Sequence, residues 1–239
     1  MDFGTNRILI TGASGWLGKT FIDALLNGLL GSDDLKPQKN IKIKCLLPHG
    51  EEKDFKMKND DKIEIVHGNI TNLEDCKNFT MKEKDAILFH CAGIIHPKKI
   101  KEFYDINVDG MENLLRASIN GRIKKIVAIS SNSPCGANPT VNHLFNESHD
   151  YNPYLNYGNS KMLMEKLILN KTKIGDIQSV IIRPPWFYGP YQPERQIRFY
   201  KMIKNGTVPV TGDGNNRQEE EHRQNGYHHS HLQTNHRQK

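Results

Sequence analysis

The chain has 239 residues, of which 36% are hydrophobic, and its 33 Lys and Arg against 27 Asp and Glu give a formal net charge of +6. This length can bury a core, and it predicts one large domain or one domain plus a fragment. The basic residues are interspersed with acidic ones, which indicates a solvated surface rather than a nucleic-acid interface. The mild positive field still suits a ligand that carries phosphates.

The spacing of the cysteines and the length of the apolar runs indicate the cellular compartment in which we expect the protein. No C-x-x-C pair occurs, so neither a zinc site nor a redox dithiol is indicated, and we expect reduced, mostly buried thiols. No apolar run approaches the ~20 residues of a membrane span, and the N-terminus lacks the layout of a signal peptide. We therefore expect a cytoplasmic protein without a membrane span. The four cysteines are Cys45, Cys76, Cys91 and Cys135.

Strand and helix patterns alternate along the chain. A β-rich stretch at residues 7–10 leads into glycines and then into an apolar helix that runs through about Leu30. Runs such as IVAIS and AILFHCA are apolar throughout, as in strands covered by helices on both faces. The pattern predicts an α/β fold with a Rossmann-type, doubly wound parallel sheet. Further strands are expected at residues 41–47, 63–66, 86–91, 123–130 and 179–182.

The segment TGASGWLG, residues 11–18, directly follows the first strand and opens the first helix. Gly12 permits a tight turn, Gly15 lets the backbone approach a pyrophosphate, and Gly18 allows close helix-to-strand packing. The N–H groups and positive dipole end of the helix favour an anion. We expect a dinucleotide phosphate here, with a glycine-rich turn that binds nothing as the alternative. The other expected cofactor contacts of this turn are Ser14, Trp16 and Leu17.

The chain resembles the short-chain dehydrogenase/reductase superfamily, whose fingerprint is TGxxGxxG, and in particular its extended, epimerase/dehydratase-like branch. Five further motifs carry the resemblance in the same order along the chain. They are HCAG at residues 90–93, NVDGMENLL at 107–115, ISSNSPCG at 129–136, YGNSK at 157–161 and RPPWFYGP at 183–190.

The resemblance implies a Ser, Tyr and Lys catalytic set. Tyr157 and Lys161 are four residues apart, so on a helix they share one face. A free tyrosine has a pKa near ~10, and an ammonium together with a cationic nicotinamide would favour its phenolate. Motif alignment gives the substrate-holding serine as Ser131, with Ser130 and Ser133 as neighbouring alternatives. Without this context, Tyr157 and Lys161 would read as a half-buried aromatic residue and a solvated charge.

The resemblance also implies NAD or NADP as cofactor. Asn69 stands where the family usually has an Asp that meets the adenine, and Asn107 is expected to support backbone geometry. An acidic residue at the end of the second strand would select NAD and an Arg would select NADP, but CLLPHGEEK, residues 45–53, offers neither clearly, because leucines and a proline stand at the discriminating positions. We favour NAD, although His49 or Lys53 could bind a 2′-phosphate. The expected cofactor contacts beyond the glycine turn are Asn69, Ile70, Ala92, Gly93, Tyr157, Lys161 and Pro184.

The family pattern stops near the C-terminus. We expect an NAD(P)-binding Rossmann domain at residues 1–188, the start of an incomplete substrate-binding domain at 189–216, which includes PVTGDG at 209–214, and a polar, His-rich, disordered tail at 217–239. The abrupt loss of apolar periodicity predicts a truncated or frame-shifted end, with a natural short form as the alternative. No metal site is expected, because His90 lies in an apolar strand and the tail lacks fixed geometry.

The predicted activity is NAD(P)-dependent hydride transfer at a substrate carbinol or carbonyl, as in an oxidoreductase, epimerase or dehydratase. Relatives act on nucleotide sugars and on hydroxysteroid-like alcohols. The expected partners are a small-molecule substrate and, by resemblance, a second copy of the chain that pairs through the helix bearing Tyr157. The alternatives are a non-catalytic dinucleotide-binding module and an inactive fragment.

Overall fold

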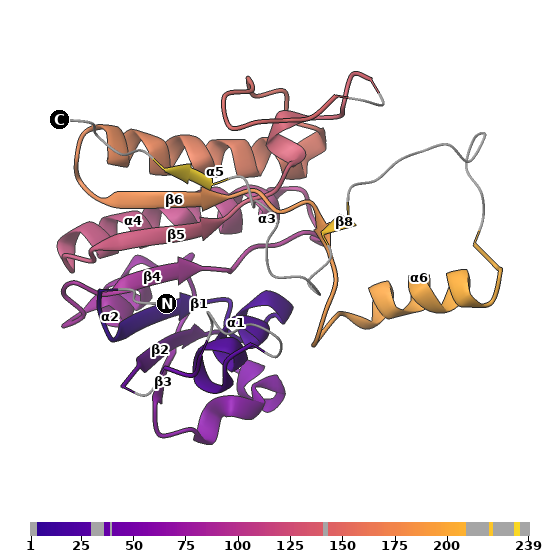
Figure 1. Ribbon diagram of the computed structural model, residues 1–239. Coiled ribbons are helices and arrows are strands. Elements are labelled where there is room, and N and C mark those ends of the chain that lie inside the picture. Colours follow the sequence, from indigo (N-terminus) through magenta and orange to yellow (C-terminus); the bar gives the residue numbers. More distant parts are fainter. Residues whose placement is uncertain are drawn as a thin grey trace.

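A parallel sheet forms the centre of the protein, which is known here from a computed structural model that describes residues 4–29, 36–38, 40–140, 143–208, 220–221 and 232–234 (Figure 1). The strand order is β3-β2-β1-β4-β5-β6, with β9 (Leu232–Thr234) antiparallel at the β6 edge. This order is that of a Rossmann sheet, so the predicted doubly wound fold is confirmed. The six parallel strands are β1 (Arg7–Thr11), β2 (Lys42–Leu47), β3 (Ile63–His67), β4 (Ile87–His90), β5 (Lys125–Ile129) and β6 (Gln178–Ile182).

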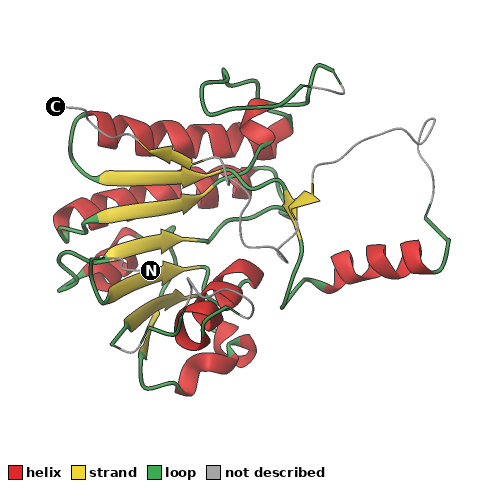
Figure 2. Cartoon of the chain, in the orientation of Figure 1, coloured by secondary structure: helices red, strands yellow, loops and turns green. Residues whose placement is uncertain are grey.

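Helices follow the strands along the chain and flank the sheet (Figure 2). The α-helices are α1 (Trp16–Asn27), α2 (Leu73–Thr80), α3 (Lys101–Tyr104), α4 (Gly110–Asn120), α5 (Leu155–Lys173) and α6 (Glu194–Lys204). The shorter elements are the 3-10 turns η1 (Glu51–Asp54), η2 (Lys56–Asn59) and η4 (Ser133–Cys135), the π-helical turn η3 (Asp105–Asp109), and the strand pair β7 (Trp186–Phe187) and β8 (Glu220–Glu221). Among the described residues, none of the helices combines the length and apolar character that a bilayer crossing requires.

Two hydrophobic cores cover the two faces of the sheet. Successive residues of a strand point to opposite faces, so Ile8 and Ile10 pack with α1, whereas Leu9 packs with α2, α4 and α5. All three of these side chains are fully buried. Burial on both faces explains why the strand sequences are apolar without alternation. The carboxyl ends of all six parallel strands therefore meet at one edge of the layered core.

The observed element ends differ slightly from the sequence-based ones. The strand predicted at 123–130 is shorter in the structure, where β5 covers Lys125–Ile129, because the chain enters it from a turn at Arg122, where φ is +56°. The backbone N–H of Ser130, just after the strand, still donates to the Ile182 carbonyl oxygen at 2.7 Å. Helix α1 ends at Asn27, and residue 30 lies outside the described residues. PVTGDG and most of residues 217–239 lie outside them too, and the described exceptions are β8 and β9.

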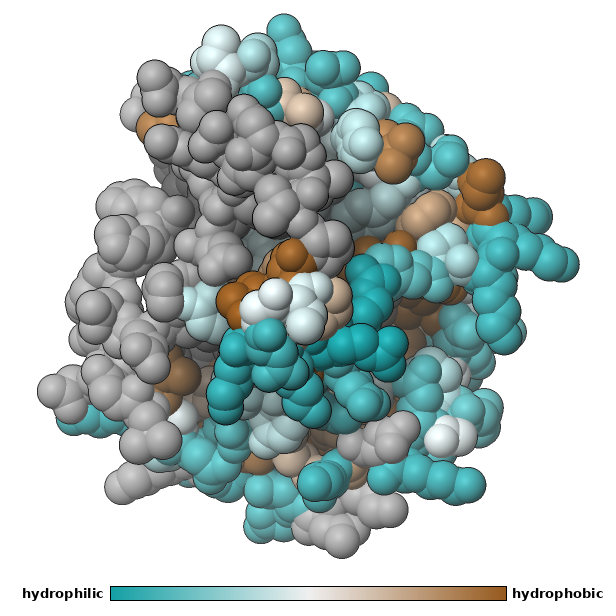
Figure 3. Space-filling model, turned by 90° about the vertical axis from the view of Figure 1, so that its right-hand side faces the viewer, coloured by the Kyte–Doolittle hydropathy of each residue, from teal (hydrophilic) through white to brown (hydrophobic). Residues whose placement is uncertain are grey.

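Helix α6 contrasts with the other long helices because none of its residues is buried. Its apolar side chains Ile197, Phe199 and Ile203 are exposed, and the helix stands off from the sheet in Figure 1. Figure 3 views the molecule from the side toward which the parallel strands run, and the described residues on this face are mostly hydrophilic, with separate brown, apolar areas. The region that follows β6 thus has little core of its own among the described residues.

The four cysteines are free thiols, as the sequence predicts. Cys45, Cys76 and Cys135 are buried, and Cys91 is partly buried. Burial raises the pKa of Cys45, Cys76 and Cys91 to about 12 in each case. These thiols are therefore protonated and poorly nucleophilic at neutral pH.

Candidate active site

The glycine turn after β1 has a geometry that only glycine can adopt. Gly12 has a φ of +71°, and a Cβ placed on it would lie 2.5 Å from the backbone nitrogen of Ala92. A Cβ on Gly18 would lie 2.2 Å from the Gly12 carbonyl oxygen. The turn is therefore packed against the end of β4 and against the first turn of α1, as expected for a nucleotide-binding loop.

The N-terminus of α1 offers an anion site. Its N-cap is Gly15, and no side chain caps it, so the first N–H groups of Trp16, Leu17 and Gly18 point outward at the positive end of the helix dipole. A cleft of about 500 Å³ lies beside this terminus. Three lysines in its lining supply positive charge near the helix end, and the site therefore fits a pyrophosphate. The cleft is lined by Ser14, Gly15, Lys19, Glu51, Lys53 and Lys56.

Glu51 is a component of this cleft that the sequence analysis did not assign. The Ser14 hydroxyl donates a hydrogen bond to its carboxylate. Glu51 belongs to η1, 37 residues further along the chain, so only the folded structure brings the two together. The carboxylate places a negative charge where an anionic ligand is expected, and a bound pyrophosphate would have to compete with it for Ser14.

The loops after β3 and β4 begin at the same edge of the sheet as the glycine turn, where the parallel strands end. The backbone N–H of Asn69 donates to Asp75 at 2.8 Å, and its side-chain oxygen accepts from the backbone of Thr71 at 3.0 Å. Ile70 is only 6% exposed and belongs to the core, and its carbonyl oxygen accepts hydrogen bonds from Asn113 at 3.2 Å and from Cys76 at 3.4 Å. Ala92 lies against Gly12. The predicted cofactor contacts of these loops thus lie at one strand edge, but their roles stay predictions.

Ser131 and Tyr157 come together at the carboxyl end of β5. Ser131 lies near enough to the Tyr157 hydroxyl to affect its ionisation. Burial raises the pKa of Tyr157, and the nearby Ser131 side chain offsets part of that rise. Ser131 also accepts a hydrogen bond from the backbone N–H of Ser133 at 3.2 Å, and the ring of Phe103 packs 5.9 Å from the Tyr157 ring. The serine and the tyrosine are therefore close enough to hold one substrate oxygen between them.

Lys161 lies one helical turn after Tyr157 on α5 and is buried, with 4% of its surface exposed. Its ammonium donates to the Ile129 carbonyl oxygen at 2.9 Å. Burial lowers its pKa to about 8, while Glu165 and Cys91 act in the opposite direction. A Cβ on Gly93 would come within 3.2 Å of the Lys161 nitrogen, so Gly93 leaves the space that the lysine occupies.

A buried polar network behind this pair was not found from the sequence. Glu165, fully buried on α5, accepts hydrogen bonds from Ser130, from Tyr151 at 2.8 Å and from Arg183 at 2.5 Å. The network ties α5 to the ends of β5 and β6. Ser130 is held by Glu165, whereas Ser131 lies beside Tyr157, so the predicted assignment of the serine to Ser131 stays open to test. The sequence signal that could have pointed to this network is a glutamate four residues after Lys161.

The segment after β6 packs against the first turns of α1, next to the glycine turn. Pro184 lies in the loop between β6 and β7, and Phe187 stacks on the Trp16 ring with 4.6 Å between centroids. The Thr20 hydroxyl donates to the Pro190 carbonyl oxygen at 3.2 Å. This segment lies more than 160 residues from α1 in sequence. In the fold it therefore lies next to α1, at the carboxyl ends of the parallel strands.

Two further residues were expected to be structural. His90 is fully buried and its Nδ1 lies 2.8 Å from the Thr11 hydroxyl, while burial, reinforced by nearby Lys161, lowers its pKa to about 3. His90 is thus a core histidine, one of the two expected environments, and its lowered pKa favours the neutral imidazole. Asn107 holds the Ile94 backbone at 3.0 Å and donates to Ser160 at 3.0 Å, which confirms its supporting role.

Known proteins resemble this chain over most of its length. A protein of Sinorhizobium fredii, y4nL, is 40% identical over 88% of this chain and 58% of its own length. A UDP-glucose 4-epimerase of Vibrio cholerae is 28% identical over 85% of this chain and 58% of its own length. A structure of dTDP-glucose 4,6-dehydratase from Bacillus anthracis, in complex with NAD, matches with a TM-score of 0.74 and 25% identity over 90% of this chain and 67% of that one.

The chain thus spans less than two thirds of the length of these two curated relatives. The sequence profile of one family matches residues 8–220, from β1 through β8. That stretch contains the glycine turn, the serine segment and the Tyr157 helix described above. The chain belongs to the NAD dependent epimerase/dehydratase family.

Proposed function

We propose that this chain carries the cofactor site and the Ser131, Tyr157 and Lys161 set of an NAD-dependent epimerase or dehydratase of nucleotide sugars. The observation that carries the proposal is the placement of Ser131 beside Tyr157 at the strand ends, one helical turn from buried Lys161. The UDP-glucose 4-epimerase and the NAD-bound dTDP-glucose dehydratase among its relatives support this substrate class and this cofactor.

The proposal assigns the following residues to the dinucleotide. The pyrophosphate would meet the first turn of α1 at Gly15, Trp16, Leu17 and Gly18, and Ser14 would bind one of its oxygens. The adenosine would lie along Asn69, Ile70, Ala92 and Gly93, and the nicotinamide would face Tyr157, Lys161 and Pro184. When bound, the nicotinamide supplies the hydride acceptor that no protein side chain offers.

The chain's own residues then handle the proton. Ser131 donates a hydrogen bond to the substrate oxygen and orients it, while Tyr157 removes the proton of the substrate hydroxyl as general base. Burial opposes ionisation of Tyr157 in the chain by itself. The positive charges of Lys161 and of the oxidised cofactor would lower its pKa toward the working range.

The test is turnover of UDP-glucose, UDP-galactose and dTDP-glucose in the presence of NAD, with products separated by chromatography. We expect Tyr157→Phe to reduce the rate by about 10²- to 10⁴-fold, the range for a lost general base. Tyr154→Phe, which changes an exposed tyrosine three residues earlier, is the matched control and should leave the rate unchanged.

An unchanged rate in Tyr157→Phe would overturn the catalytic role. A chain that shows no turnover, but whose melting temperature rises with NAD, would indicate the alternative of a binding module, because a ligand that binds only the folded state stabilises it.

A further inference from the structure

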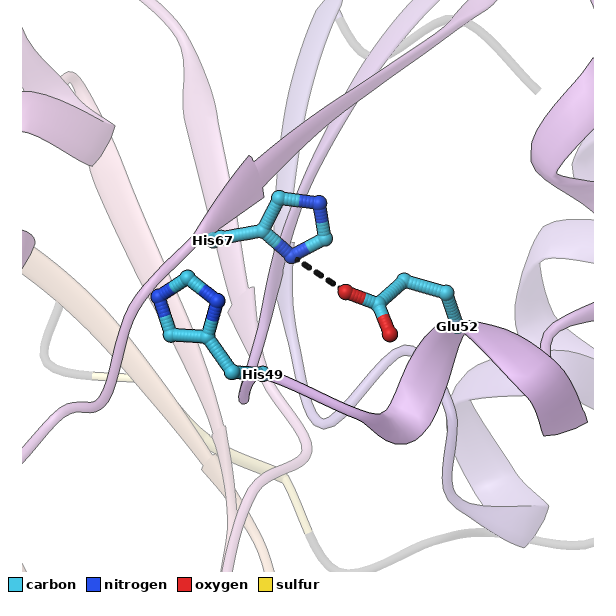
Figure 4. Close-up of side chains that lie close together, drawn as sticks. All are labelled: His49, Glu52 and His67. Atoms are coloured by element: carbon cyan, nitrogen blue, oxygen red, sulfur yellow. Dashed lines mark ion pairs between the residues drawn. The ribbon is translucent and has the colours of Figure 1, made fainter.

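Three side chains with metal-binding atoms meet where β2 and β3 end (Figure 4). His67 is the last residue of β3 and pairs in register with Leu47, the last residue of β2. His49 lies two residues after Leu47, and Glu52 lies three residues after His49, on η1. The parallel register, and not a sequence motif, therefore brings the two histidines and the carboxylate together.

The donor atoms are close to the spacing of a chelate. One ligand atom from each residue lies within 4.8 Å of the others, and His67 Nδ1 is 2.8 Å from Glu52 Oε1. The two imidazole rings stack with 5.2 Å between centroids. Ligands about 2.0–2.2 Å from a tetrahedral zinc ion lie roughly 3.3 Å apart. Small rotations of these partly exposed side chains would reach that spacing.

We propose that His49, Glu52 and His67 form a binding site for a divalent transition-metal ion of the zinc type. Two imidazole nitrogens and one carboxylate oxygen are a donor set that zinc accepts, with water completing the tetrahedron. Magnesium and calcium prefer sites built from oxygen ligands and do not match this set. The site is separate from Ser131, Tyr157 and Lys161, and it does not depend on the function proposed above.

The simpler arrangement is a His67–Glu52 ion pair with no metal. That pair needs only two of the three residues, so the contribution of His49 distinguishes the two explanations. A metal site requires both histidines, whereas the ion pair with Glu52 requires only one of them, His67.

The test uses the full-length chain with the five tail histidines replaced by Asn, because those side chains can chelate metal without a folded site. They are His222, His228, His229, His231 and His236. Zinc binding is measured by competition with a chromophoric chelator, and cobalt is then added in its place to record the visible absorption of a tetrahedral ion. We expect one zinc per chain and a tetrahedral cobalt spectrum.

His49→Ala and His67→Ala should each weaken zinc binding at least tenfold. His149→Ala is the matched control, because it disrupts another adjacent histidine pair, His143 and His149, with 4.9 Å between ring centroids. A melting curve without metal checks that each variant folds. If His49→Ala does not fold, His49→Asn takes its place. Zinc affinity that is unchanged in the His49 variants, or an octahedral cobalt spectrum, would overturn the proposal.

Discussion

The two ends of the candidate active site are held in different ways. At the Tyr157 end, Lys161 and Glu165 are buried and bonded to the ends of β5 and β6. At the phosphate end, Ser14 and Glu51 meet in an open cleft beside an uncapped helix terminus. The first end is organised by packing before any ligand arrives, whereas the second depends on charge and backbone N–H groups.

The difference has an energetic consequence. Charges in a buried network interact strongly and are costly to leave unpaired, while charges in an open cleft are screened by water and salt. Substitutions at the Tyr157 end should therefore change folding stability, and substitutions at the phosphate end should change ligand affinity with little effect on folding.

The largest effect is expected for Glu165→Gln. It leaves the buried guanidinium of Arg183 without its charge partner, which typically lowers the free energy of unfolding by about 3–5 kcal/mol. Urea denaturation measures the change. Glu112→Gln, at an exposed glutamate in the first turn of α4, is the matched control and should change stability by less than about 0.5 kcal/mol.

The double replacement Glu165→Met with Arg183→Met sharpens this comparison. Removing both charges together should restore much of the lost stability, because no uncompensated charge stays buried. If Glu165→Gln alone unfolds at the same urea concentration as the unmodified chain, the buried network does not organise this end of the site.

A smaller effect of opposite sign is expected for Lys161→Met. Burial lowers the lysine pKa from 10.5 to about 8, so between these pH values the unfolded chain binds more protons than the folded chain. The resulting cost to stability is complete below pH 8 and disappears as the pH rises toward 10.5. Removing the ammonium should therefore stabilise the fold at pH 7 by about 1–3 kcal/mol, with this advantage shrinking at higher pH.

Urea unfolding of both proteins at pH 7 and pH 9.5 measures that change. Lys173→Met, at an exposed lysine near the end of the same helix, should give the same small difference at both pH values. A stability difference for Lys161→Met that grows with pH would contradict the assigned burial.

The smallest effect is expected at the phosphate end. Glu51→Gln removes a carboxylate that bonds Ser14 in the cleft, so NAD should bind about two- to fivefold more tightly at low salt, the scale of a solvent-exposed charge interaction. Isothermal titration at 50 mM and 500 mM salt measures it, and Glu112→Gln serves again as control. An affinity gain that persists unchanged at high salt would argue against an electrostatic cause.

The sequence predicted the parts of the protein that depend on local pattern. Apolar runs separated by glycine turns identified all six parallel strands, and the Tyr157–Lys161 spacing placed both residues on α5, because helical periodicity is written in the sequence. Whether each cofactor-contacting residue meets a ligand stays a prediction.

Contacts between distant segments were out of reach of the sequence. Glu51 meets Ser14, and Arg183 meets Glu165, only after strands 30 or more residues apart have paired, and neither contact leaves a periodic signal. The neighbouring strand ends likewise bring His49 and His67 together without a recognisable ligand spacing. These contacts are determined by the sheet topology, which no single residue pattern specifies.

The buried cysteines give this fold an internal reporter of its own opening. Cys45 belongs to the core on the α1 side of the sheet and Cys76 to the core on the α2 side, and burial keeps both thiols protonated. A thiol-labelling reagent can reach either one only when that side of the protein opens. The labelling rates of the two positions would therefore measure separately how often each half of the molecule unfolds under native conditions.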